Sequence, residues 1–309
     1  MKILFSIIIP AYKKKFLYEA IESCLLQKYD NFEVIIIDDC SPENLGEIVD
    51  KFNSPKIKYY RNTCNIGAIN LVDNWNYGLS LCKGEYVICM GDDDRLTSNC
   101  LESYYRIISN HADVKVIHGW TEIIDENGSF KEITLMRPEW ESAYSLAWSR
   151  WHGRIRQFIG DWCFRISHLR KIGGFYKLPM AWASDDITAV NAAIDNGVWN
   201  TNDLCFQYRE NSLTVSNTGS AKIKMEAIIQ EKKWFENFLT RSCSNEIDMK
   251  IRQNIEDDME NHFLRKKRDL IENDLRNGGS LLYWLTKAKN YKMRKRDILR
   301  AFIPRLLRK

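Results

Sequence analysis

The sequence predicts an α/β protein with a mostly parallel sheet flanked by helices, followed by a helical C-terminal appendage. Three observations predict this fold class. Short β-branched, apolar runs alternate with segments of helical apolar spacing through residues 1–95. These runs are continuously apolar, which is typical of strands buried on both faces. From residue 220 onward the pattern is helical and amphipathic, with few helix breakers.

Length and composition are those of a globular chain. The 309 residues allow either two domains or one large domain with an appendage, at roughly 100–200 residues per domain. Hydrophobic residues make up 45% and charged residues 28%, which excludes disordered and fibrous classes. We divide the chain into a domain over 1–219, with halves 1–95 and 96–219, and a helical basic region over 220–309.

The cysteines and the apolar segments indicate a compartment. The nine cysteines are an odd number with no CxxC pair, so a disulfide framework and a zinc site both lack the spacing that they need. We expect reduced, buried thiols. No stretch reaches the ~18 apolar residues of a membrane span, and the N-terminus lacks a small-residue cleavage site. We therefore expect a cytoplasmic protein.

The first half of the chain predicts four strands with helices between them. The strands are expected at Ile3–Pro10, Phe32–Ile37, Ile57–Arg61 and Tyr86–Met90. The helices are expected at Phe16–Gln27, Glu43–Phe52 and Ile69–Cys82. Right-handed crossovers then bring the four strands into one parallel sheet.

The second half predicts fewer regular elements. After a helix over Asn99–His111, the segment Val114–Thr134 predicts a hairpin, because its Asn-Gly pair favours a type I′ turn. The stretch Trp140–Trp162 is rich in Trp and Arg, and it forms either an aromatic core layer or the lining of a sugar or phosphate site. A further helix is expected over Ile187–Asn196.

Acidic residues directly follow two of the predicted strands. Asp38-Asp39 comes after the second strand and Asp92–Asp94 after the fourth. Ligands of parallel sheets bind beyond the carboxyl ends of the strands. Three adjacent carboxylates repel one another, so Asp92–Asp94 indicates a site for a hard divalent cation. Asp38-Asp39 fits either a turn with a helix cap or a carboxylate that accepts hydrogen bonds from a nucleobase or ribose.

Several common catalytic motifs are missing from the sequence. There is no GxGxxG after the first strand and no GxxxxGK[ST], so dinucleotide binding and a P-loop lose their main support. Neither GxSxG nor HExxH occurs. The five histidines show no ligand spacing, and we expect them to be incidental.

Five motifs, taken in order, resemble those of the family 2 glycosyltransferases, which have the GT-A fold. They are Ser6–Tyr12, Ile35–Ser41, Asn65-Ile66-Gly67, Gly84–Val87 and Gly91–Asp94. The resemblance covers about residues 3–215 and continues through Cys163-Phe164-Arg165 and Gly173-Gly174-Phe175. Asn74-Trp75-Asn76 resembles a variant found in bacterial members that build surface polysaccharides of the cell envelope.

The resemblance implies a role for each matching residue. A nucleotide sugar would be held by Pro10, Ala11, Tyr12, Asp38, Asp39, Asn65, Gly67, Asp92 and Asp93. Asp94 would bind Mn²⁺ or Mg²⁺ across the diphosphate, with Asp92 as the first carboxylate of the Asp-x-Asp. The family often has a His as a further ligand after a Tyr-Arg segment, and Asn211 stands near that position here. The base belongs to a Glu-Asp pair, which is Asp185-Asp186 in this sequence, with Asp186 as the first candidate and Asp185 as the second.

These roles imply an inverting, metal-dependent glycosyltransferase. It would move a sugar from a nucleotide-diphosphate sugar, a UDP-sugar first, to a hydroxyl of a glycan or lipid-linked acceptor. A divalent cation stabilises the departing diphosphate, and one carboxylate takes the acceptor's proton. Two alternatives stay open. A non-catalytic sugar-nucleotide or glycan-binding module would have no turnover, and a sugar nucleotidyltransferase would need a Gly-rich loop that Pro10–Lys13 lacks.

The C-terminal segment Lys287–Lys309 is basic and amphipathic. Ten Lys or Arg accompany a single acid, Asp297. Such a segment fits a helix at an anionic membrane surface, which would place the protein peripherally at the inner face of the cytoplasmic membrane. It also fits a helix packed on its own domain. We expect no nucleic-acid partner, because no recognised nucleic-acid fold accompanies the basic residues.

Overall fold

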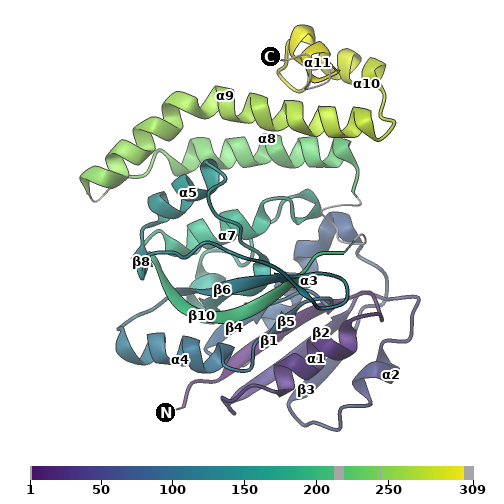
Figure 1. The fold of residues 1–309 in the computed structure, drawn as a ribbon, viewed down its shortest axis with the longest axis vertical. Helices are drawn as coiled ribbons and strands as arrows, with labels where there is room; N and C mark the ends of the chain where they lie inside the picture. The colour runs from purple at the N-terminus through teal and green to yellow at the C-terminus, as the bar shows by residue number, and fades with distance from the viewer. Residues whose placement is uncertain (1, 212–218, 244, 303–309) are drawn as a thin grey trace.

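The computed structural model describes residues 2–211, 219–243 and 245–302, which form a sheet domain with long helices across one end (Figure 1). The sheet has ten strands in the order β3-β2-β1-β4-β9-β6-β10-β5, with β7 beside β6 and β8 beside β10. This arrangement confirms the predicted α/β class, the mainly parallel sheet and the helical C-terminal region.

The four strands predicted in the first half all form and pair in parallel. They are β1 (Phe5–Ala11), β2 (Phe32–Asp38), β3 (Ile57–Arg61) and β4 (Tyr86–Cys89). The helices between them are α1 (Leu17–Leu25), α2 (Gly46–Val49), the short η1 (Ala68–Asn70) and α3 (Leu71–Leu81). Of the helix expected over 43–52, only the turn α2 forms, because Asn44 and Gly46 are poor helix formers at its start.

The second half adds strands to the free edge of β4. Here β9 (Trp162–Arg165) runs antiparallel to both β4 and β6 (Val116–Ile124), and β10 (Val198–Arg209) pairs in parallel with β6. The remaining strands are the short β5 (Arg95–Leu96), β7 (Phe130–Ile133) and β8 (Trp140–Glu141). The helices are α4 (Cys100–Asn110), α5 (Ala143–Trp151), η2 (Ile159–Asp161), α6 (Ile166–Lys171), η3 (Pro179–Ala181) and α7 (Ser184–Ala193).

The predicted hairpin forms between β6 and β7, but the turn is not of type I′. Only Gly128 adopts a positive φ (+83°), whereas a type I′ turn would also place Asn127 there. The Gly128 N–H donates to the Asp125 carbonyl at 3.0 Å, and the Asp125 N–H donates to the Ser129 carbonyl at 2.9 Å. The loop is therefore longer, with one glycine in the left-handed region.

Apolar side chains are buried on both faces of the sheet, as the continuous apolar runs predicted. On β1, Ile7 and Ile9 pack into one core, whereas Ile8 packs into the core on the other face. All nine cysteines are unpaired in the structure, and six of them are buried. Trp162, from the Trp- and Arg-rich stretch, is fully buried in the core that contains Ile8.

Gly78 lets α3 approach β1 closely, so Gly78→Ala should destabilise the fold. An added Cβ would lie 2.5 Å from Cγ2 of Ile8, and overpacking of this kind costs about 1–3 kcal/mol. Helix propensity alone predicts the opposite change in stability, because alanine is more favourable than glycine within a helix by about 1 kcal/mol. Urea unfolding measures the difference. Ser80→Ala on the exposed face of α3 is the control, and a stabilised Gly78→Ala protein would contradict the close approach.

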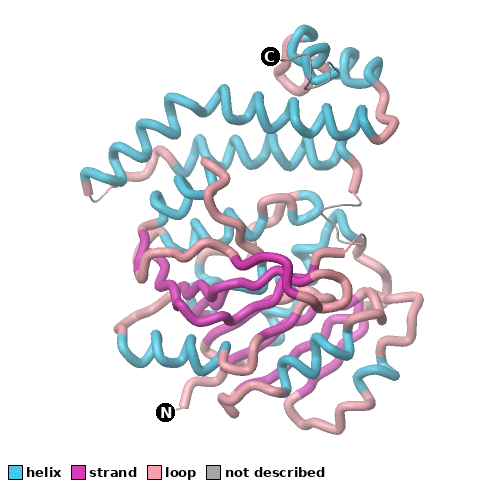
Figure 2. The backbone as a smooth tube through the Cα atoms, viewed as in Figure 1, coloured by secondary structure: helices cyan, strands magenta, loops and turns pink. Residues whose placement is uncertain are grey.

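Two long helices, α8 (Ala221–Phe238) and α9 (Glu246–Arg276), lie side by side across one end of the sheet domain (Figure 2). After them, α11 (Lys295–Phe302) packs back onto α9, and α10 (Leu281–Lys287) packs against α11. Trp284 of α10 also donates a hydrogen bond to Asp274 of α9 at 2.8 Å. None of the helices in the described ranges is both long and apolar enough to cross a bilayer.

The basic C-terminal segment packs against these helices. Its apolar residues Tyr291, Met293 and Ile298 are buried in a small core with residues of α8 and α9. Leu299 and Phe302 are exposed, and residues 303–309 of the segment lie outside the described residues. Packing on the chain's own helices therefore occupies several of the apolar side chains that suggested a membrane surface, and membrane association stays a prediction.

Candidate active site

A cavity of about 460 Å³ opens beyond the carboxyl ends of β1, β2 and β4. We refer to it as the first cavity. It brings together nine residues predicted from the sequence, namely Pro10, Ala11, Tyr12, Asp39, Asn65, Gly67, Asp92, Asp93 and Asp94. They come from loops that the topology gathers at one edge of the sheet, where ligands of parallel sheets bind.

The acidic triplet Asp92–Asp94 is held in place by backbone amides. The N–H groups of Tyr12 and Lys13 donate to Oδ2 of Asp92 at 2.7 and 2.8 Å, which ties the loop after β1 to the triplet. Burial, together with the charge of Asp93, raises the pKa of Asp92 to about 6. Asp92 therefore shapes the wall of the first cavity.

The other two carboxylates of the triplet are each held through one oxygen. The Arg209 N–H donates to Oδ1 of Asp94 at 2.9 Å, and the Asn211 amide donates to Oδ2 of Asp93 at 2.7 Å. The remaining oxygens, Oδ1 of Asp93 and Oδ2 of Asp94, would each lie 2.8 Å from a Cβ added to Gly91. Glycine at this position therefore leaves a small space on which two carboxylate oxygens converge.

The chemistry of this space fits a hard divalent cation. Burial and the charges of Asp93 and Asp92 raise the pKa of Asp94 well above its usual range. A bound cation would relieve this repulsion, and oxygen ligands are those that Mg²⁺ and Mn²⁺ prefer. Across the described ranges, no three His, Cys, Asp or Glu side chains are grouped so as to hold a metal by themselves. A cation at Asp94 would therefore need further oxygen ligands from a bound molecule.

Asp38 and Asp39 have different places in the structure. Asp38 is fully buried and does not line the first cavity. Its carboxylate accepts hydrogen bonds from the Ser41 N–H at 2.7 Å and from the side chains of Tyr59 and Arg61 on β3. Asp38, expected at the nucleotide, is therefore a structural anchor, because its oxygens are taken up by the neighbouring strand and loop.

Asp39 does reach the first cavity, and it also orders the loop 62–67. Its Oδ1 accepts hydrogen bonds from the Asn62 amide at 2.9 Å and the Ile66 N–H at 2.8 Å. Its Oδ2 accepts from the Gly67 N–H at 3.0 Å and the Asn65 amide at 3.2 Å. Asp39 thus fixes the loop that lines the cavity beside it.

The paired acids at the start of α7 differ in their partners. Oδ2 of Asp186 accepts a hydrogen bond from Nη2 of Arg150 at 2.7 Å, and Oδ1 accepts one from Nε2 of Gln157 at 2.7 Å. No ion pair joins Asp185 to a basic side chain of the described residues. Burial and the charge of Asp186 raise the pKa of Asp185 to about 7. Neither acid lines the first cavity.

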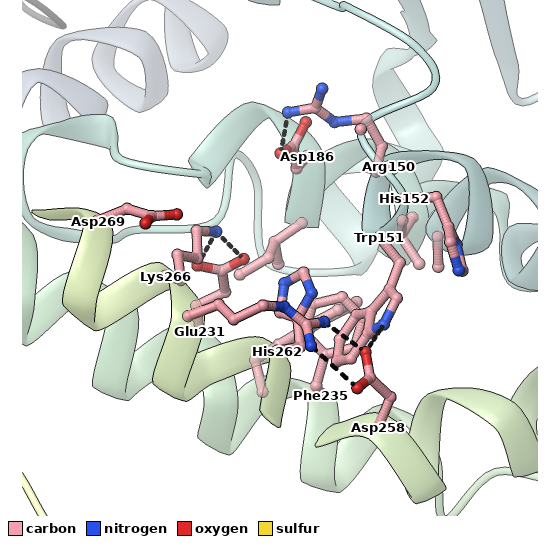
Figure 3. A pocket seen from close by; sticks show the side chains of 16 residues that line it. Arg150, Trp151, His152, Asp186, Glu231, Phe235, Asp258, His262, Lys266 and Asp269 are labelled. Atoms are coloured by element: carbon pink, nitrogen blue, oxygen red, sulfur yellow. Dashed lines mark hydrogen bonds and ion pairs between the residues drawn. The ribbon is translucent and has the colours of Figure 1, made fainter. Parts of the chain in front are cut away.

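A second cavity, of about 570 Å³, lies between α5 and α7 on one side and α8 and α9 on the other (Figure 3). Asp186 and Arg150 face it from the sheet domain, and three basic side chains that line it are all in ion pairs. These pairs are Arg150–Asp186 at 2.7 Å, Lys266–Glu231 at 2.6 Å and Arg265–Asp258 at 2.7 Å.

The aromatic wall of the second cavity is neutral. Trp151 stacks on the imidazole of His262, with ring centroids 3.8 Å apart. Burial lowers the pKa of His262 to about 4, so this ring is uncharged at neutral pH. From the Trp- and Arg-rich stretch, Trp162 belongs to the core, as one of the two predictions had it, whereas Arg150 and Trp151 line this cavity. A sugar or phosphate ligand for the stretch stays a prediction.

Arg209 is a site residue that the sequence did not single out. It is only 1% exposed, and its guanidinium donates to the carbonyls of Asp93 and Glu126 and to the carboxylate of Glu19. It thereby joins β10, the hairpin turn and α1 to the acidic triplet. Its neighbour Tyr208 lines the first cavity and stacks on Phe158 at 3.8 Å. In the sequence, the only indication that Tyr208 and Arg209 belong to the site is their position just before Asn211.

Comparison with known sequences shows what this chain is similar to. The model of the family described as "Glycosyl transferase family 2" matches residues 6–173. The glycosyltransferase GlyG of Streptococcus pneumoniae is 31% identical over 135 residues, which are 42% of this chain and 43% of GlyG. The chain thus aligns with less than half the length of this curated relative.

Two solved structures share the fold. S. aureus TarS (1–349) with UDP-GlcNAc has a TM-score of 0.66 at 18% identity, covering 88% of this chain and 81% of that one. A mannosyltransferase from Pyrobaculum calidifontis with GDP-Man and Mn²⁺ has a TM-score of 0.58 at 16% identity, covering 100% and 88%. At these identities the likeness concerns the fold alone.

Proposed function

The chain belongs to glycosyl transferase family 2, and we propose that it moves a sugar from a nucleotide-diphosphate sugar to a hydroxyl of a glycan, with inversion at the transferred carbon. One observation carries this proposal. The acidic triplet, the loop after β1 and the loop around Asp39 meet in one cavity beyond the strand ends. Asp94 would hold a divalent cation, which would supply stabilisation for the negative charge that develops on the departing diphosphate.

We propose a UDP-sugar as the donor. Two of the structural relatives are named with UDP-GlcNAc and with GDP-Man and Mn²⁺, which supports a nucleotide-sugar donor and a divalent metal. The loop ordered by Asp39 and the loop after β1 would bind the nucleoside, and Asp93 would bind the ribose or the sugar. Asn211 would act on the site through Asp93, to which it donates a hydrogen bond.

We assign the general base to Asp185 and give Asp186 a positioning role. A base needs a carboxylate oxygen that is free to accept the proton of the attacking hydroxyl. Both oxygens of Asp186 are occupied by Arg150 and Gln157. As the acceptor O–H bond breaks, its proton passes to Asp185 and its oxygen bonds to the anomeric carbon. The bond from that carbon to the diphosphate breaks, and the electron pair leaves with the diphosphate.

The second cavity is our proposed acceptor site. It is lined by Asp186, the chain neighbour of the assigned base Asp185, and its basic side chains are neutralised by acids. A neutral sugar, whose hydroxyls both donate and accept hydrogen bonds, suits such a lining better than an anion does. A glycan of surface polysaccharide biosynthesis is the acceptor class we propose, and a lipid carrier at its far end would bring the enzyme to the inner face of the membrane.

Thermal unfolding with UDP, GDP, CDP and dTDP, each with and without Mn²⁺, tests the donor site. A diphosphate at 100 times its dissociation constant should add about 2.7 kcal/mol to the free energy of unfolding. We expect one diphosphate to do so strongly, and only with the metal, because the carboxylates of the triplet otherwise repel it. The diphosphate that stabilises the protein identifies the nucleobase of the sugar donor.

The same measurement, together with the transfer rate of one variant, separates the alternatives. If no diphosphate stabilises the protein under any condition, the proposed donor site is contradicted, and a glycan-binding module becomes the better interpretation. If a diphosphate binds but Asp185→Asn leaves the rate of transfer unchanged, the assigned base is wrong while the donor site stands.

A further inference from the structure

A third cavity, of about 600 Å³, lies between α8, α9 and the segment 290–297 of the basic C-terminal region. It shares no lining residue with the first or second cavity. The basic segment builds one wall, through Tyr291, Lys292 and Arg294. The proposed sugar transfer uses none of these groups.

The charges that line the third cavity do not balance. Five basic side chains face three acidic ones. Lys232 takes up two of the acids, since it pairs with Glu236 at 3.5 Å and also with Glu260. Arg294 pairs with the third acid, Asp297, at 3.0 Å. No ion pair joins the other three lysines to an acid of the described residues, and these are Lys233, Lys267 and Lys292.

Lys267 makes this imbalance costly. Its side chain is 7% exposed, and its Nζ donates to the Tyr291 carbonyl at 3.0 Å. An ammonium group carries three N–H donors, and a buried charge without a counter-charge destabilises a fold. Burial, reinforced by the charges of Lys232 and Lys292 and only partly opposed by that of Glu260, lowers the pKa of Lys267. A bound anion would supply the missing counter-charge and further acceptors.

We propose that the third cavity binds a phosphate group through Lys233, Lys267 and Lys292. A phosphate carries more than one negative charge and presents several oxygens in different directions, which suits three separate ammonium groups. All three lysines line the cavity; Lys233 and Lys292 are exposed, whereas Lys267 is buried. The phosphate could belong to a membrane lipid headgroup or be free in solution, and both present the same chemistry to these lysines.

Binding measurements on the full chain test the site without any reference to sugar transfer. Isothermal titration with inorganic phosphate probes the free anion. Co-sedimentation with phosphatidylglycerol vesicles, against phosphatidylcholine vesicles, probes the headgroup. Each lost charge-assisted hydrogen bond weakens binding by about tenfold. We therefore expect Lys233→Gln with Lys292→Gln, which removes two such bonds, to weaken binding of the effective probe by about tenfold to hundredfold.

A matched double variant controls for general surface charge. Lys295→Gln with Arg296→Gln removes two exposed charges from α11 that do not line the third cavity, and it should keep binding within about twofold, the scatter usual for a screened surface charge. Lys267→Met tests whether the buried lysine contributes to binding. The unfolding transition of this variant is measured as well, so that a loss of binding can be told from a loss of folding.

The outcomes decide both the site and the source of the phosphate. Binding of inorganic phosphate that depends on Lys233 and Lys292 supports a site for a free phosphate. Co-sedimentation with the anionic vesicles alone, with the same dependence, supports a lipid headgroup. Binding of neither probe overturns the proposal. So does an equal loss in the α11 control variant, because general attraction of the basic segment would then explain the binding.

Discussion

Asp94→Asn should abolish nearly all sugar transfer, with a fall of about 10³-fold in kcat/KM. Asparagine keeps the size of the side chain and an oxygen that can accept the Arg209 N–H. It removes the negative charge of the carboxylate that would hold the cation, whose Oδ2 faces the space next to Gly91. Metal stabilisation of a departing phosphoryl oxygen contributes several kcal/mol, and each 1.36 kcal/mol is a factor of ten in rate. Initial rates of nucleotide release at saturating Mn²⁺ measure the effect.

The fold of the Asp94→Asn protein should be intact, which makes the loss of activity interpretable. Burial and the neighbouring carboxylates oppose the charge on Asp94, so a neutral side chain relieves repulsion and should leave the unfolding midpoint unchanged or higher. Asp73→Asn is the matched control, because Asp73 lies on exposed α3 surface in an ion pair with Lys177. An Asp94→Asn enzyme within tenfold of the parent rate would show that the triplet holds no catalytic metal.

The first half of the sheet could be predicted from the sequence, because the apolar pattern that specifies each of its strands lies within the strand itself. The strand β3 begins and ends at the predicted residues, and the apolar runs of β1, β2 and β4 fixed those strands to within two residues. By contrast, β10 was missed. Its polar stretch at Asn200–Asp203 coincides with shifts of register against β6, and its pairing depends on a strand some 80 residues earlier in the chain. Such a strand has no periodicity of its own to detect.

The candidate site shows the same division between local and distant information. Residues that follow a strand directly, such as Asp39 and the triplet, could be placed at the cavity because topology alone puts them there. The sequence could not separate Asp38 from Asp39, since the partners that bury Asp38 come from β3. The resemblance ranked Asp186 before Asp185 as the base, and the sequence held no sign of the opposite order, since Arg150 and Gln157 reach Asp186 from 36 and 29 residues away.

Asp185→Asn should lower kcat by about 10²–10⁴-fold, the usual contribution of a general base, while the dissociation constant for the nucleoside diphosphate stays the same. Asparagine cannot take the proton of the acceptor hydroxyl, and Asp185 does not line the first cavity. Asp186→Asn should have a smaller effect. This change weakens the hydrogen bonds with Arg150 and Gln157 but does not remove the group that accepts the proton. Single-turnover rates and diphosphate binding are measured for both variants. The opposite ranking would return the base to Asp186.

The pH profile distinguishes a base from a purely structural carboxylate. Burial and the charge of Asp186 raise the pKa of Asp185 to about 7, and only the deprotonated form can accept a proton. The rate of the parent enzyme should therefore fall as pH drops through about 7 and level off above it. In Asp185→Asn the residual rate should lose this inflection, whereas Asp186→Asn should keep it but shift it to lower pH, because the neighbouring negative charge that opposes ionisation is gone. If the inflection is unchanged in Asp185→Asn, the titration that it reports belongs to a group other than Asp185.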